Sequence, residues 1–156
     1  MTTEIKEKKM TRNVLLSGLI LLCFGLSSAY AADSLVKYPI KDSMELEKVK
    51  NLFDDDISFY WGNAPHGKVT KKFGSFKTSK RTNGFGKEQS QACAWAMASS
   101  LVALRDRAKR EGGNAVINIV SNIKNNEESS ETAYSCLAGR VVVNVALKGT
   151  VVTIQK

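Results

Sequence analysis

The segment from Lys87 to Glu111 constrains the fold most strongly, because its apolar residues recur with the period of an α-helix. Steps of four, four, three and four residues separate Cys93, Met97, Leu101, Leu104 and Ala108. A helix with one apolar face has to cover another hydrophobic surface. Gly112-Gly113 then offers a left-handed stop, and the β-branched residues 115–120 predict an interior strand. The sequence therefore predicts an α+β fold, with this helix packed on an antiparallel sheet.

The segment before the long helix predicts one short helix and two strands. Residues 35–40 are expected to be extended, because Pro39 disfavours helix for the residue before it. Asp42 and Glu45 have capping-box spacing, and the helix they begin has a rough apolar face made by Met44, Leu46, Val49 and Leu52. Residues 54–56 form a turn. Residues 57–61 then predict a strand, and residues 68–81 are expected to return beside it as the second strand of a hairpin.

The end of the chain predicts two adjacent antiparallel strands. Residues 125–130 are polar and predict a loop. Residues 132–147 predict one long strand, and Lys148-Gly149 is expected to turn it into a last strand over residues 151–154. We expect three aromatic side chains to lie in the core, namely Trp61, Trp95 and Tyr134.

Residues 1–31 have the order of a secretory signal peptide. Four basic residues precede an uncharged apolar stretch, and small residues at Ala29 and Ala31 predict cleavage before Ala32. An uncleaved anchor is the alternative, but the apolar core is shorter than the roughly 20 residues that a spanning helix needs. Translation from Met10 would give a shorter signal of the same kind. We therefore expect residues 32–156 to form a single exported α+β domain with a net charge of +6.

Two cysteines, Cys93 and Cys136, remain after the predicted cleavage. In an oxidising compartment, an even pair in a small domain favours a disulfide. This bond would join the early turns of the long helix to the strand predicted over residues 132–147. A metal or redox pair is the alternative, but the chain has no Cys-x-x-Cys motif and only one histidine, His66.

Several motifs are spread over most of residues 32–156: FYWG (59–62), TNGFGK (82–87), QACAWA (91–96), GGNAVINI (112–119), CLAG (136–139) and VALKG (145–149). Together they resemble a family of small exported proteobacterial proteins that commonly carry the label of the excinuclease ABC ATPase. More distantly, the helix, its glycine turn and the following strand are similar to the Rcs-pathway outer-membrane stress-sensor lipoprotein and to a small family named heavy-metal-binding. This second resemblance implies a disulfide-linked α+β sandwich that acts through protein contacts.

A basic segment is the main candidate for a ligand surface. It combines Phe73, Phe76 and Phe85 with a series of cations, of which we single out Lys68, Lys71, Lys72, Lys77, Lys80 and Arg81 as an anionic-ligand surface. The alternative is a solvated edge strand whose lysines discourage sheet-to-sheet aggregation. ATP is not expected as a ligand, because the chain has no Gly-x-x-x-x-Gly-Lys-Ser/Thr loop.

Catalytic spacings such as Gly-x-Ser-x-Gly and His-Glu-x-x-His are absent from the sequence, and His66 lies in a predicted turn. We therefore expect a non-enzymatic periplasmic or envelope-associated interaction protein, without catalytic residues, cofactor or metal. Its expected partner is an envelope protein or an anionic envelope component. We expect no nucleic acid and at most peripheral contact with the membrane. The alternatives are an excinuclease-like or nucleic-acid-associated protein, as the family label suggests, and a hydrolase with an unfamiliar site.

Overall fold

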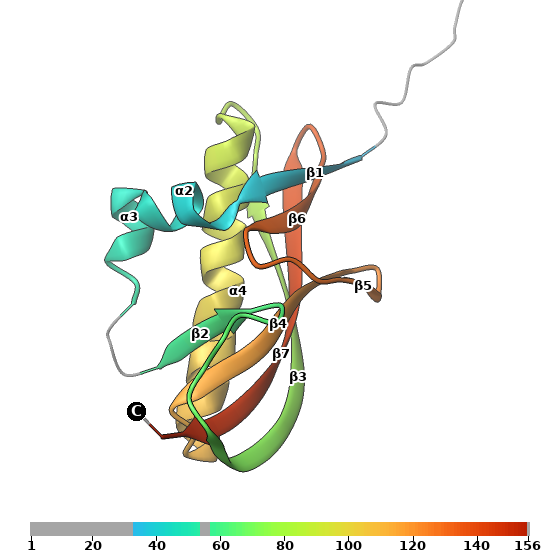
Figure 1. Ribbon diagram of the computed structural model, residues 1–156. Coiled ribbons are helices and arrows are strands. Elements are labelled where there is room, and N and C mark those ends of the chain that lie inside the picture. The colour runs from blue at the N-terminus through green and yellow to red at the C-terminus, as the bar shows by residue number, and fades with distance from the viewer. Residues whose placement is uncertain (1–32, 54–56, 156) are drawn as a thin grey trace, which may run out of the picture. The chain divides into compact units, whose positions relative to one another are not determined.

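A computed structural model of the chain describes residues 33–53 and 57–155, and the predicted signal peptide with its cleavage site lies outside them. The fold is α+β, as predicted (Figure 1). None of its helices within the described residues has the length and apolar character needed to cross a membrane. The elements are β1 (Ser34–Pro39), α2 (Ile40–Glu45), α3 (Glu47–Lys50), β2 (Ser58–Trp61), β3 (Val69–Asn83), α4 (Gln89–Glu111), β4 (Ala115–Ile123), β5 (Asn126–Glu128), β6 (Ala133–Ala138) and β7 (Val142–Ile154).

The strands form one seven-stranded sheet in which β7 is the central element. The order β1-β6-β7-β4-β2 runs along the sheet, and the remaining strands β3 and β5 pair with β7 and β4. One edge of β7 pairs with β3 over nearly its whole length. The other edge pairs first with β6 and then with β4. All pairings are antiparallel except that between β2 and β4.

Helix α4 packs against one face of this sheet, as its apolar period predicts (Figure 1). The predicted stripe is confirmed: Cys93, Met97, Leu101, Leu104 and Ala108 are all buried. The helix ends at Gly112, whose φ of +80° is left-handed, as expected for a helix stop. Trp61 and Tyr134 are buried as predicted, but the prediction for Trp95 is wrong, since its side chain is 40% exposed on the outer side of the helix.

The disulfide between Cys93 and Cys136 is confirmed, with an S–S distance of 2.08 Å. Cys93 lies in the second turn of α4 and Cys136 in β6, and both residues are fully buried. The bond therefore fastens β6 beneath the helix. Another buried contact lies close to it in sequence: the hydroxyls of Tyr134 and Ser43 are 2.9 Å apart. Burial raises the pKa of Tyr134 to about 12, so its phenol stays neutral and continues to join β6 to α2.

The predicted N-terminal helix is two short helices instead of one. The first begins at Ile40, before the predicted cap Asp42, and no side-chain hydrogen bond caps it. The chain becomes extended at Leu46, with ψ at 128°, and a second short helix follows. The break turns the predicted apolar stripe, so that Val49 is buried while Leu46 stays partly exposed. Packing on the core has overridden the local helical pattern.

The predicted hairpin between residues 57–61 and 68–81 is wrong, although both segments are strands. Strand β2 pairs in parallel with β4, whereas β3 pairs with β7 at the other side of the sheet. The turn residues 62–67 therefore connect two strands that do not touch as a ladder.

The C-terminal strands begin and end at other residues than predicted. Residues 126–128 form β5 instead of a loop, and the break between the last two strands lies at residues 139–141. Lys148 and Gly149 do not turn, because β7 runs straight through them. Gly149 is needed there for close packing: a Cβ on it would lie 2.6 Å from Val116 Cγ1 and 3.5 Å from Leu104 Cδ1 of α4. The glycine marks close approach of the helix, not a turn.

Candidate anionic-ligand groove

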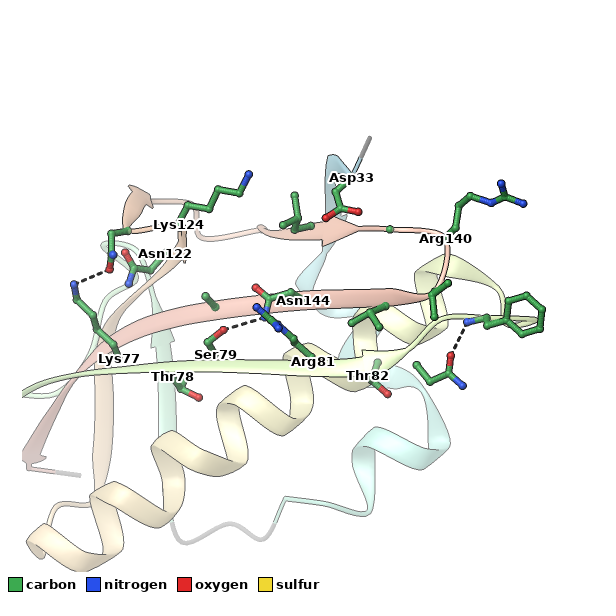
Figure 2. A pocket seen from close by; sticks show the side chains of 18 residues that line it. Asp33, Lys77, Thr78, Ser79, Arg81, Thr82, Asn122, Lys124, Arg140 and Asn144 are labelled. Carbon is green, nitrogen blue, oxygen red and sulfur yellow. Dashed lines mark hydrogen bonds between the residues drawn. The ribbon is translucent and has the colours of Figure 1, made fainter. Parts of the chain in front are cut away.

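A groove of about 1350 Å³ lies on the face of the sheet opposite α4 (Figure 2). Because side chains alternate along a strand, β7 sends Val143 and Val145 to the core while Val142, Asn144 and Ala146 face the groove. Strand β3, the end of β6 and the turn between β4 and β5 supply the rest of the lining. The central strand therefore forms the groove floor and the core wall at the same time.

Four cationic side chains line the groove. Lys77 and Arg81 come from β3, Lys124 from the turn between β4 and β5, and Arg140 from the turn between β6 and β7 (Figure 2). Within residues 33–53 and 57–155, none of the four forms a salt bridge. The acidic lining residue in this part of the chain is Asp33 at the rim. Like charges that converge without counter-ions produce a positive potential in a concave surface.

The acidic residues of β5 do not neutralise these cations, because other lysines already pair with them. Glu127 Oε1 accepts a hydrogen bond from Lys148 Nζ at 2.7 Å. Glu128 pairs with Lys37 and accepts a hydrogen bond from Ser135 Oγ at 2.6 Å. The hydrogen bonds from Lys37 and Ser135 hold the pKa of Glu128 below its usual value. The hairpin carboxylates therefore stay ionised and engaged outside the groove.

Amide side chains line the groove between its cations. Asn144 Nδ2 donates to Ser79 Oγ at 2.9 Å and to the Lys80 carbonyl at 3.2 Å, which fixes the floor to β3 (Figure 2). Lys77 Nζ donates to Asn125 Oδ1 at 3.2 Å, which ties one end of the groove together. Asn122 is only 5% exposed, and its Oδ1 has no hydrogen-bond partner among the described residues. A buried amide oxygen without a donor is costly unless a ligand or water supplies one.

The turn between β4 and β5 places Lys124 and Asn125 at the groove. Ile123 pairs with Asn126, so the loop between them has two residues. Both have positive φ, 53° for Lys124 and 63° for Asn125, as a type I′ hairpin turn requires. The tight turn holds these two side chains beside Lys77 without a flexible loop.

The structure divides the six basic residues of the predicted ligand surface. Only Lys77 and Arg81 line the groove. Lys80 pairs with Val145, a core residue, and opposed residues of a ladder share a face, so Lys80 lies on the other side of β3. Lys71 Nζ lies 4.6 Å from the centre of the Phe73 ring. The residues outside the groove lining are Lys68, Lys71, Lys72 and Lys80.

Sequence reasoning did not identify several of the lining residues, among them Lys124, Arg140, Asn122 and Asn144. Lys124 and Arg140 each lie in a short polar break between strand-forming segments, which is the one local signal they carry. Their convergence depends on the exchange of β6 for β4 along one edge of β7, which no local pattern reports.

One end of the groove is apolar. Phe85, Val141 and Val142 line it there and are 72%, 59% and 44% exposed. Leu137 also lines the groove, and its ladder partner Leu35 is 57% exposed. The groove thus combines cations along its length with an exposed apolar group at the end near Arg140.

His66 lies away from the groove. Its Nδ1 is 2.8 Å from the Gly67 carbonyl, and its ring packs edge-on against Tyr60. It is exposed and is not part of the groove lining. In residues 33–53 and 57–155, no three His, Cys, Asp or Glu side chains are grouped so that they could hold a metal ion.

Comparison of the chain with protein-family models, with curated proteins and with solved structures found no match. The resemblance to the exported excinuclease-labelled family therefore stays a hypothesis, and the functional argument depends on the groove itself.

Proposed function

We propose that this chain is a non-enzymatic binding protein of the bacterial cell envelope that holds an anionic partner on the open face of its sheet. The observation that carries the proposal is the convergence of Lys77, Arg81, Lys124 and Arg140 over one groove without a salt-bridged carboxylate in the described residues. Four uncompensated cations attract an anion and increase its rate of encounter.

Location in the envelope is supported by two independent features. The sequence of residues 1–31 has the order of a cleavable export signal. The disulfide between Cys93 and Cys136 is typical of proteins that fold in an oxidising compartment. In the periplasm, anionic partners include acidic proteins and acidic glycans, so a cationic groove has ligands to meet there.

The proposal is tested by titrating the protein from a periplasmic extract, where we expect it to begin at Ala32, with labelled oligogalacturonate, polyphosphate and neutral dextran. We expect the anionic oligomers to bind and dextran not to bind. Binding should weaken strongly as salt shortens the Debye length from about 30 Å at 0.01 M to about 10 Å at 0.1 M. Equal binding of dextran, or no binding of any anion at low salt, would contradict the proposal. Recovery of the chain only as an uncleaved cytoplasmic protein would contradict its location.

A further inference from the structure

We infer that the groove takes an extended acidic segment of a partner protein, with an apolar side chain at the Arg140 end; this deepens the anion-binding function proposed above, on which it rests. The segment presents two carboxylates to Lys77 and Arg81. Length, polarity of the lining and hydrogen-bonding needs each point to a peptide.

The length of the groove suits a short extended segment. Lys77, Ser79, Arg81 and Asn83 are alternate residues of β3, so all four line the same face. At about 3.3 Å per residue, the distance from Lys77 to Asn83 is about 20 Å, which an extended segment of about seven residues would span. Lys77 and Arg81 are four positions apart on the strand, so they match carboxylates four positions apart on the partner.

The apolar end requires more than an anion. Val142 pairs with Asn83, two positions along β3 from Arg81. Its side chain is 44% exposed beside Val141, which is 59% exposed. A sugar acid or a free phosphate leaves these methyl groups in water, whereas a leucine-like side chain on a peptide removes them from it. The partner should therefore carry an apolar residue two positions from the carboxylate that meets Arg81.

The unpaired oxygen of Asn122 requires a donor from the ligand. Carboxylate and ionised phosphate oxygens only accept hydrogen bonds, but a peptide backbone supplies N–H donors between its side chains. Asn122 lies at the Lys77 end of the groove, beside the turn that carries Lys124 (Figure 2). A peptide whose carboxylate meets Lys77 can thus donate a nearby N–H to Asn122 Oδ1.

A nucleic-acid strand fits the lining less well. Single strands bind by stacking successive bases on aromatic rings along a cationic groove. In the described residues the aromatic side chain of the lining is Phe85, at one end. The middle of the groove is formed by amides, hydroxyls and aliphatic side chains such as Asn144, Ser79 and Ala146.

The test uses capped heptapeptides with leucine at the first position, glutamate at the third and seventh, and serine elsewhere, together with the reversed sequence. We expect one of the two orders to bind at least tenfold more tightly than its glutamine version. Changing the peptide leucine to serine should weaken binding at least threefold to the wild-type protein and have no effect on a Val142→Ser protein. Val142 is partly exposed, so this variant keeps the fold.

The outcomes separate the two proposals. Peptides that bind no better than their glutamine versions, while oligogalacturonate or polyphosphate binds, would overturn the peptide assignment and leave anion binding standing. Failure of every anion would overturn both. A leucine effect that is unchanged in Val142→Ser would place the apolar contact elsewhere and overturn the proposed orientation.

Discussion

Replacing Cys93 and Cys136 together by alanine is expected to lower the free energy of unfolding by about 4 kcal/mol. The two residues are 43 positions apart in sequence, and closing a loop of this length reduces the entropy of the unfolded chain by about that amount. Domains of this size have total stabilities of about 5–15 kcal/mol, so the loss is a large fraction. The effect reaches the groove, because the bond fastens β6, whose C-terminal end carries Leu137 and leads to Arg140.

The measurement is urea unfolding of the oxidised wild type, the reduced wild type and the double-alanine variant. Both cysteines are fully buried, so alanine keeps the packing apolar and the two thiol-free or reduced forms should unfold at similar urea concentrations. A loss below about 1 kcal/mol would contradict the view that this bond holds helix and sheet together.

Reversing the charge of Arg81 and Lys124 to glutamate is expected to weaken anion binding roughly thirtyfold to hundredfold, about 2–3 kcal/mol. Both side chains line the groove, from opposite walls, and both are exposed. The variant therefore loses two attractive contacts and gains two repulsive ones, while its free energy of unfolding should change by no more than about 0.5 kcal/mol for each substitution.

The matched control reverses Lys72 and Lys80, which lie on the same strand outside the groove lining. It has the same change in net charge, so a general effect of protein charge would weaken binding equally in both variants. We expect the control to weaken binding less than threefold, which is the modest change that a remote surface charge produces. Equal losses in the two variants would show that the groove geometry does not matter.

Local patterns were sufficient to predict helix α4, its glycine stop and the disulfide. The apolar residues from Cys93 to Ala108 keep a helical period because one face of the helix is buried along its length. The cysteine pair needed only its compartment and its number. These features depend on neighbours in sequence or on simple elimination.

The strand pairings and the groove could not be predicted in the same way. β3 reads as a hairpin partner of the strand before it, but it pairs with β7, about 70 residues later in the chain. Gly149 has the composition of a turn, yet it is a strand residue held close to α4 by side chains of Val116 and Leu104. Because Lys124 and Arg140 reach the groove only through those distant pairings, the sequence indicated two of the four groove cations.

Amide chemical-shift mapping of the labelled mature protein tests the groove most directly. During titration with the acidic heptapeptide or oligogalacturonate, we expect the largest shifts in residues 77–83, 122–125 and 137–144, which border the groove. The outer side of α4 around Trp95 should stay unchanged. Largest shifts on that helix face, or none anywhere when binding is saturated, would contradict a ligand site on the open face of the sheet.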